Sequence, residues 1–351
     1  MLDPARSRLY VAGTNVLYQL DDALRVSHKV ETGPVLDSHE CSATECSNGP
    51  TTKVDTDNHA KVLVLDARSD RLLLCGSVCQ GACYRHSLTD ITANTEQLLT
   101  AVAAKTEAAS TFGFIGPQQY NPWNSDDVLY VGTTFTQHGD YRHDVPAISS
   151  RNLDNLQFAE FSFSRQSLLR IDVKYRDHFL VDYVHGFNSS SHVYFVTVQK
   201  KSYLPGEAEA GYVTRISRTC VTDANFDTYS EVTLECRLGG DNYNLVQDAV
   251  TLPASKKLAE DLGVSEGDQV LVAVFAPGRD MTSRPQGRTC TCASTARGWT
   301  TSASATTTCP SCPRNCSWRC ANMSSAWRYS TQKSPKLKWR DSSKLCHPSL
   351  F

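Results

Sequence analysis

The stretch LLLCGSVCQGACYRHSL, from Leu72 to Leu88, places cysteines at positions 75, 79 and 83. Its glycines and serine disfavour a helix, and its flanks are rich in residues typical of strands. We therefore expect a hairpin in which Cys75 ends one strand and Cys83 begins the next. Cysteines that face each other across a hairpin mouth can reach the ~5.5 Å Cα separation that a disulfide needs. The stretch predicts a Cys75–Cys83 bridge with Cys79 at the loop tip.

A zinc site is the alternative interpretation of this stretch. Three thiols with His86 would be an unusual ligand set, because structural zinc sites pair their ligands at shorter spacings. The choice matters for the whole chain, since bridges indicate an oxidising compartment and metal sites do not. With 14 cysteines in 351 residues, the chain is cysteine-rich.

Most of the remaining chain has the pattern of β-strands. Short runs rich in Val, Leu, Tyr and Phe are bounded by Gly, Asp, Asn and Ser, which is typical of strands and turns. The expected strands are 8–13, 61–66, 71–76, 128–132, 178–184, 192–198, 212–220, 231–238 and 269–276. Only residues 254–263 have helical spacing, with a glycine at the end.

The strands recur in a repeated pattern. The repeated unit is a polar residue followed by an apolar strand and a turn, and it recurs about every 55 to 80 residues. This spacing is somewhat longer than the ~40 to 50 residues of common propeller blades. In the first two units a second strand follows the turn directly. A radial array of four-stranded blades explains this repetition and covers most strand edges. A β-sandwich with long loops is the alternative fold.

Charge and composition divide the chain near residue 289. Residues 289–351 contain nine of the 35 Lys and Arg but one of the 37 acids, which leaves 26 bases and 36 acids in residues 1–288. This acidic region does not favour nucleic-acid binding, because binding to phosphates needs clustered Lys and Arg side chains. The tail, 289–351, is rich in Ser and Thr and lacks apolar alternation, so we expect it to be disordered or non-native in origin.

The sequence was searched for a signal peptide and a membrane-spanning segment. The N-terminus, MLDPARSRLYVAG, lacks the features of a signal peptide, and the longest apolar run is too short to span a bilayer. We expect no membrane contact by the chain itself. The start directly in a strand-like segment is what a truncated or incomplete sequence would show.

Seven segments together resemble one known family. They are TGPVLDSHECSATECS (32–47), TDNHAKVLVLD (56–66), RLLLCGSVCQGACYRHSL (71–88), SSRNL (149–153), RISRTCVTD (215–223), NLVQDA (244–249) and VLVAVFAPG (270–278). The succession resembles the N-terminal part of the sema domain of plexins, the semaphorin receptors, and of an invertebrate member in particular. It covers residues 1 to about 288.

The resemblance implies an all-β fold, namely a partial seven-bladed β-propeller with about four to five blades present. It implies a bridge between Cys41 and Cys46 and another between Cys75 and Cys83. Cys79 stands where relatives tend to have a small uncharged residue, so it is a departure and a possible free thiol. Cys220 and Cys236 match family cysteines whose partners lie further downstream.

The resemblance also implies the function. The chain would be an extracellular fragment of a plexin-like receptor at the plasma membrane. Its partner would be the sema domain of a semaphorin, in axon guidance and cell signalling. The sequence offers no phosphate loop, dinucleotide fingerprint, nucleophile elbow or H-E-x-x-H motif, so we expect neither an enzyme nor a cofactor.

Two segments are candidates for ligand contact. The first is QHGDYRHD, which follows an expected strand and contains His138, Asp140, His143 and Asp144. These groups could bind a divalent metal in a propeller or sandwich enzyme, but a surface connection rich in polar residues is the simpler interpretation. Because the plexin family binds its ligand around blades three and four, we expect His143 and Asp144 to contact it.

The second segment is AEFSFSRQS, in which Phe161 and Phe163 are two residues apart and would share one face of a strand. Core packing is the ordinary role of such a pair, and ligand contact is the functional one. Asn188, in FNSSSH, is a glycosylation sequon between two expected strands, where a glycan could project.

Overall fold

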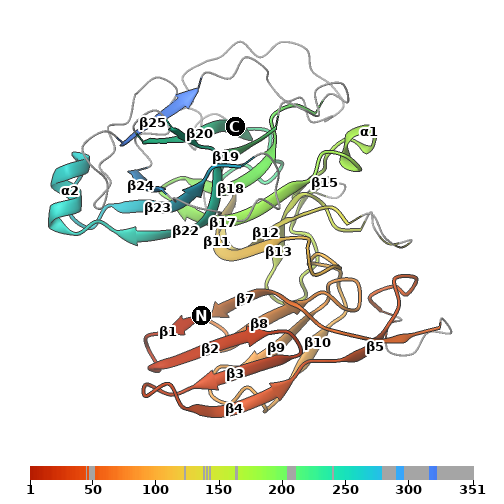
Figure 1. Cartoon of the computed structure of the whole chain (residues 1–351). Helices are drawn as coiled ribbons and strands as arrows, with labels where there is room; N and C mark the ends of the chain where they lie inside the picture. The colour runs from red at the N-terminus through yellow and green to blue at the C-terminus, as the bar shows by residue number, and fades with distance from the viewer. Residues whose placement is uncertain are drawn as a thin grey trace. The chain divides into compact units, whose positions relative to one another are not determined.

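The computed structural model of the chain consists mainly of β-strands (Figure 1). It describes residues 1–44, 46, 52–121, 124–136, 139, 141, 144–162, 165–203, 211–238, 241–278, 290–295 and 316–321. The strands form two compact units. Unit 1 contains residues 1–117 and 126–170, and unit 2 contains residues 118–125 and 171–351.

Unit 1 is built on three four-stranded antiparallel sheets. The first sheet has the order β1 (Leu2–Asp3), β2 (Arg8–Gly13), β3 (Val16–Leu20) and β4 (Val26–Glu31). The second has the order β10 (Glu96–Leu98), β9 (Cys83–Ser87), β8 (Arg71–Gly76) and β7 (Ala60–Asp66). The third has the order β11 (Thr111–Asn121), β12 (Asn124–Thr133), β13 (Ile148–Asn152) and β16 (Leu168–Leu169).

Two short ribbons accompany these sheets. One pairs β5 (Val35–Asp37) with β6 (Val54–Thr56), and the other pairs β14 (Glu160–Ser162) with β15 (Arg165–Gln166). Figure 1 shows that the β5 ribbon extends beyond the sheets of unit 1.

Unit 2 contains the fourth and fifth sheets. The fourth has the order β17 (Val181–Ser189), β18 (His192–Lys200), β19 (Tyr212–Cys220), β20 (Ser230–Leu238) and β21 (Asp241–Tyr243), and β25 (Cys316–Ala321) also pairs with β20. The fifth has the order β22 (Leu245–Pro253), β23 (Gln269–Ala276) and β24 (Cys290–Thr295).

The described part of the chain has two short helices, α1 (Val173–Arg176) and α2 (Lys256–Leu262). The second lies within the range expected from the sequence. It ends at Gly263, whose φ of 67° is the left-handed conformation that commonly closes a helix. No helix among the described residues is long and apolar enough to cross a membrane.

The strand β8 explains why the opening stretch organises unit 1. Alternate side chains of a strand point to opposite faces of its sheet. Leu72 and Leu74 pack in a core with Tyr10 and Leu17 of the first sheet. Leu73 and Cys75 lie in a different core, which includes residues of the third sheet. A continuous apolar run therefore serves two cores, one on each face of the second sheet.

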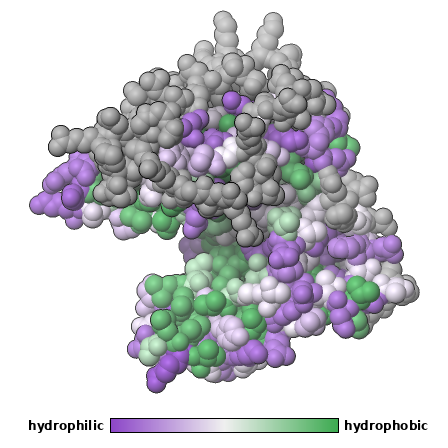
Figure 2. Space-filling view, viewed as in Figure 1, coloured by the Kyte–Doolittle hydropathy of each residue, from purple (hydrophilic) through white to green (hydrophobic). Residues whose placement is uncertain are grey.

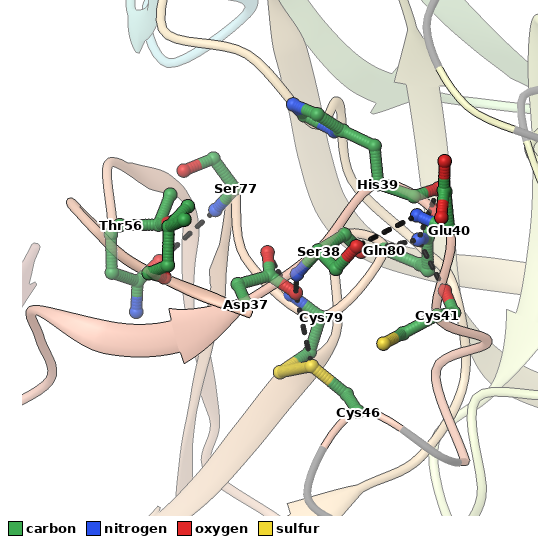
Figure 3. The surroundings of a disulfide bond; sticks show 12 residues. Asp37, Ser38, His39, Glu40, Cys41, Cys46, Thr56, Ser77, Cys79 and Gln80 are labelled. Atoms are coloured by element: carbon green, nitrogen blue, oxygen red, sulfur yellow. Dashed lines mark hydrogen bonds between the residues drawn. A yellow bond between two sulfur atoms is a disulfide. The ribbon is translucent and has the colours of Figure 1, made fainter. Parts of the chain in front are cut away.

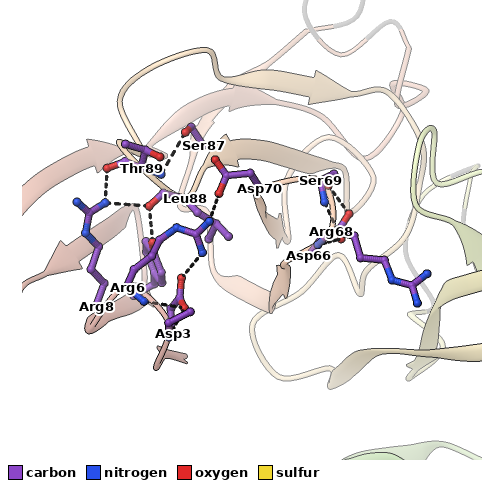
Figure 4. Close-up of polar contacts among 12 residues, drawn as sticks. Asp3, Arg6, Arg8, Asp66, Arg68, Ser69, Asp70, Ser87, Leu88 and Thr89 are labelled. Atoms are coloured by element: carbon purple, nitrogen blue, oxygen red, sulfur yellow. Dashed lines mark hydrogen bonds and ion pairs between the residues drawn. The ribbon is translucent and has the colours of Figure 1, made fainter.

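Polar contacts also join the first and second sheets (Figure 4). The guanidinium of Arg6 donates to Asp3 over 2.9 Å and also pairs with Asp70, which lies in the turn before β8. Arg8 donates to the carbonyl oxygen of Leu88 over 3.0 Å. The two sheets are thus held together at their margin as well as through their shared apolar core.

The outer face of the first sheet is also apolar. In the strand register Leu9 lies opposite both Leu2 and Leu20, and Leu20 lies opposite Val26, so these four residues form a row across the sheet. Leu2 is 61% exposed and Val26 is 57% exposed. Figure 2 shows apolar side chains gathered over this part of unit 1. The first sheet therefore carries apolar side chains on both faces.

Each expected strand falls on an observed one, and four have the expected bounds, namely β2, β8, β19 and β23. Two segments of the region expected to be irregular are strands. Cys290–Thr295 pairs with β23, and Cys316–Ala321 pairs with β20. The other residues from 289 onward lie outside the described part of the chain.

Candidate functional site

The expected hairpin forms between β8 and β9. Cys75 lies directly opposite Cys83, with a Cα–Cα distance of 3.9 Å, and their sulfurs are bonded at 2.05 Å. The bridge closes the mouth of the hairpin, as the sequence predicted.

The connection between these strands is buried rather than exposed. Every residue from Leu72 to Cys83 is buried. The carbonyl oxygen of Gly81 accepts hydrogen bonds from the backbone N–H groups of Val102 and Ala103, over 3.1 Å and 3.0 Å. The hairpin loop is thus enclosed by other segments of unit 1.

The structure corrects two expectations about the remaining cysteines. Cys46 is bonded to Cys79 and not to Cys41, with a Cα–Cα distance of 5.4 Å (Figure 3). Cys79 therefore lies in the hairpin loop, as expected, but it is buried and bonded rather than a free thiol. Its φ of 51° turns the loop, and its backbone N–H donates to the Asp37 carboxylate over 3.0 Å. These contacts bring Cys79 to the loop that contains Cys46.

Asp37 organises this cluster. Its carboxylate is buried, accepts the N–H groups of Ser38 and Cys79 over 2.8 Å and 3.0 Å, and lies 3.1 Å from the sulfur of Cys46. Gln80 completes the enclosure, because its amide donates to the carbonyl oxygens of Ser38, His39 and Cys41. A carboxylate bonded to two backbone N–H groups fixes the segment after β5 against the hairpin loop.

The same cluster contains the one group of potential metal ligands found in the described part of the chain. One donor atom each from Asp37, Cys46 and Cys79 lie within 4.8 Å of one another. Thiolates, not disulfide sulfurs, are the usual protein sulfur ligands of metals such as zinc. With Cys46 and Cys79 bonded to each other, this arrangement does not offer the thiolates of a zinc site.

A shallow cavity of about 350 Å³ lies beside the cluster. Its lining comes from both strands of the β5–β6 ribbon and the segments that follow and precede them, namely Asp37, Ser38, His39, Glu40, Thr52, Val54 and Thr56. Leu36 and Val54 of the same ribbon are 60% and 64% exposed.

The segment QHGDYRHD is described only in part. Its residues His138, Asp140 and His143 lie outside the described part of the chain. Asp144 is exposed, and its N–H donates to the carbonyl oxygen of Tyr141 over 3.1 Å. A Cβ atom on Gly139 would lie 2.2 Å from the carbonyl oxygen of His39, so this loop passes close against the segment after β5.

The other predicted site residues are placed as follows. Phe161 belongs to β14, and Phe163 lies outside the described part of the chain. Asn188 is half-buried near the end of β17, opposite Val193 in the register. Cys220 and Cys236 are both in disulfides.

Two of the motifs quoted above have structural roles here. In SSRNL, Arg151 is 1% exposed, donates to Ser149 Oγ over 3.1 Å and to the carbonyl oxygen of Leu156 over 2.9 Å, and lies over the ring of Phe158. Burial lowers its pKa to about 9. In NLVQDA, Asn244 joins β19 to the end of β23 through hydrogen bonds of its side chain to Tyr212 and Gly278.

Sequence reasoning missed a buried ion pair in the fourth sheet. Arg215 Nη1 and Glu231 Oε2 are 2.9 Å apart, and the two side chains are only 8% and 4% exposed. Gln199 Nε2 and Tyr229 Oη also donate to the Glu231 carboxylate, over 3.1 Å and 2.6 Å. Charged residues in strands usually face solvent, so the sequence alone carries no signal for this network.

Three partly or fully buried histidines predict acid sensitivity. Burial lowers the pKa of His86 and His185, and burial together with the nearby Arg218 lowers the pKa of His192 to about 4. The unfolded chain takes up these protons near pH 6.5, whereas the folded chain resists them. Acid therefore favours the unfolded state, and the free energy of unfolding should fall as the pH drops from about 6.5 toward 4.

Urea unfolding of the full chain at pH 7.5, 6 and 5 measures this effect. His192→Gln should make the fall shallower. Equal stability of the unsubstituted chain at all three values would contradict the prediction.

Comparison with known proteins places these features in a family. No family model matches the chain. The chain is 31% identical to human Plexin-A4 over 314 residues, which cover 83% of the chain and 16% of Plexin-A4. It is 32% identical to Plexin-A4 of Danio rerio over 305 residues, which cover 79% of the chain and 15% of that protein. The chain thus spans about one sixth of the length of these curated relatives.

Solved structures agree. The full extracellular region of Plexin A4 matches with a TM-score of 0.68 and 27% identity, over 84% of this chain and 33% of that one. Semaphorin 1a of Drosophila, extracellular domains 1–2, matches with a TM-score of 0.54 and 16% identity, over 85% of this chain and 52% of that one, which is a likeness of fold alone. The prediction of a partial β-propeller of the sema type is confirmed. The chain belongs to the plexin family, as a segment homologous to the sema-domain part of a plexin extracellular region.

Proposed function

We propose that this chain is a ligand-recognition segment of a plexin-type receptor on the cell exterior and that its partner is the sema domain of a semaphorin. The observation that carries the proposal is the 31% identity to human Plexin-A4 over 83% of the chain. The matching structure is that of an extracellular region. Binding a protein partner requires a complementary surface but no catalytic residue. The proposed role is therefore recognition without catalysis or a cofactor.

Two bridges between described residues support an extracellular role. The Cys75–Cys83 and Cys46–Cys79 bonds join buried segments of unit 1, and disulfides of this kind persist in oxidising compartments. The rival idea of a metalloenzyme centred on QHGDYRHD has no support from the related proteins, which are plexins and semaphorins. We also propose that Asn188 carries a glycan.

The proposed contact surface lies on the loops of unit 1 that follow the third sheet's strands. It includes His143 and Asp144, which follow β12, together with Phe161 and Phe163, which lie between β13 and β16 in the sequence. Asp144 is exposed, as a contact residue in an uncomplexed chain must be. A carboxylate at the margin of an interface acts mainly through charge complementarity with the partner.

Binding of the full chain to immobilised semaphorin ectodomains tests the proposal. We expect at least one semaphorin to bind and Asp144→Lys to weaken binding about tenfold, since reversing one interfacial charge costs on the order of 1.4 kcal/mol or more. Asp22→Lys makes the same charge change at an exposed turn in the first sheet and should leave the affinity unchanged. Absence of binding to every semaphorin, with a folded chain, would refute the proposed partner.

A further inference from the structure

The face of the first sheet that points away from the second sheet is called the outer face. It carries the row formed by Leu2, Leu9, Leu20 and Val26. Two further rows lie beside this one along the strands. They consist of Val11, Tyr18 and Lys29, and then of Gly13, Val16 and Glu31. Apolar side chains thus cover most of the outer face, and its two charges lie on the edge strand β4.

The inner face of the same sheet shows what such a surface contacts. Its Tyr10 and Leu17 are completely buried in the core shared with the second sheet. The outer face has the same alternation of apolar residues, but Leu2 and Val26 are more than half exposed and Val11 is 42% exposed. Figure 2 shows these apolar side chains at the surface of unit 1. Because contiguous apolar surface marks contact sites in soluble proteins, the outer face is suited to packing against another sheet.

The turn between β3 and β4 adds a second observation. Leu24 lies in this turn, between Leu20 and Val26 of the first row, and is 65% exposed. Its φ of 58° is in the left-handed region, which is unfavourable for a residue with a Cβ atom and which Gly or Asn adopts more readily. An exposed leucine in this conformation contributes nothing to the core of the sheet. Its position is explained if the turn borders a contact surface.

We propose that the outer face binds the outer face of a second copy of this chain, so that the two copies form a symmetric dimer. The two-fold axis is parallel to the strands and lies between β2 and β3. It places Leu2 of one copy opposite Val26 of the second copy, and Leu9 opposite Leu20 of the second copy. Each contact forms twice, which closes the assembly at two copies. This self-association does not depend on the semaphorin partner.

The charges on β4 favour this axis over the alternative. Lys29 and Glu31 are 3.3 Å apart, and both are exposed at the edge of the sheet. With the axis parallel to the strands, this edge forms the rim of the interface, where charged side chains remain in contact with water. An axis perpendicular to the strands would instead place Glu31 against Val26 of the second copy. That arrangement would remove a carboxylate from water without a partner, which is unfavourable.

The size of the outer face indicates a weak dimer. A face four strands wide and six residues long has a footprint of roughly 400 Å², from strand spacings of about 4.8 Å and rises of about 3.3 Å per residue. Stable complexes of standard size bury about 800 Å² per partner, and smaller interfaces are typical of weak complexes. We therefore expect a dissociation constant in the micromolar range.

Analytical ultracentrifugation of the full chain, over about two orders of magnitude in concentration around 10 µM, tests the proposal. We expect a shift from monomer to dimer with no larger species, because a two-fold interface is closed. Monomer at every concentration would overturn the proposal, as would growth beyond the dimer, which indicates a head-to-tail contact. A dimer that persists in SDS without reducing agent would overturn it too, since a disulfide-linked dimer does not need this face.

A matched pair of variants locates the contact. Val26→Lys places a charge in the first row and should raise the dissociation constant at least tenfold. Val54→Lys is the control, because Val54 is 64% exposed but belongs to the β5–β6 ribbon, and it should leave the dissociation constant unchanged. Both side chains are exposed, so the variants should unfold at the same temperature as the unsubstituted chain. Equal dissociation constants for Val26→Lys and Val54→Lys would overturn the proposed surface.

Mixing two variants tests the symmetry axis. In dimers of Leu2→Glu alone, or of Val26→Lys alone, each introduced charge lies opposite an apolar side chain. In the mixed dimer the two introduced charges lie opposite each other and have opposite signs. We therefore expect the mixture to associate at least tenfold more tightly than either variant alone. No gain on mixing would show that Leu2 of one copy does not meet Val26 of the other, which would overturn the proposed axis.

Discussion

Replacing Glu231 with alanine is expected to lower the free energy of unfolding of unit 2 by about 3–5 kcal/mol, which is the usual effect of breaking a buried ion pair. The substitution leaves the guanidinium of Arg215 buried without its counter-charge. It also removes the acceptor for the side chains of Gln199 and Tyr229. Urea unfolding of the full chain measures the change.

Two comparisons make this prediction specific. Glu31→Ala breaks the exposed pair of Lys29 and Glu31, whose side chains are 47% and 78% exposed, and should cost less than about 1 kcal/mol. The double variant Arg215→Met with Glu231→Leu should be less destabilised than Glu231→Ala, because it removes both charges together. A loss below about 1 kcal/mol for Glu231→Ala would show that water or another group compensates Arg215.

Replacing Gly81 with alanine is expected to be similarly severe. Gly81 has a φ of +79°, and a Cβ atom there would lie 2.0 Å from the carbonyl oxygen of Ala103. The left-handed conformation costs a non-glycine residue roughly 1–2 kcal/mol, and forcing extra volume into packed surroundings costs about 1–3 kcal/mol more. The neighbour is backbone that is hydrogen-bonded to Gly81 itself, so it cannot move aside without breaking those bonds.

Gly263→Ala provides the matched control. Gly263 has a φ of +67° but no atom within 4 Å of the added Cβ. It should therefore show only the conformational cost of roughly 1–2 kcal/mol. The difference between the two substitutions isolates the effect of enclosure. Equal effects would indicate that the hairpin loop can open locally, contrary to its buried position.

The local features of the fold could be predicted from the sequence. The strand β8 and its turn are specified by neighbouring residues, and a hairpin register places Cys75 opposite Cys83 without reference to the rest of the chain. The helix α2 has a glycine at its end for a similarly local reason. The motifs of the family were also recognisable, because each is a short stretch of adjacent residues.

The pairing of Cys46 could not be predicted in this way. Three cysteines within the same buried cluster can pair in more than one way, and the structure departs from the expected Cys41–Cys46 bond. The choice depends on contacts of Asp37 and Gln80 with residues some 40 positions away. The burial of the loop likewise depends on a later segment, since the N–H groups of Val102 and Ala103 donate to the carbonyl oxygen of Gly81.

The sequence by itself determined the strands, the hairpin with its bridge and the family to which the chain belongs, because these depend on alternation, turn residues and short motifs. Only the tertiary structure decided which sulfur Cys46 meets, that the loop from Gly76 to Ala82 is buried, and that Arg215 and Glu231 face each other inside the fourth sheet. The physical reason is that burial and pairing depend on segments brought together in space, and their free energies are set by groups distant in the sequence.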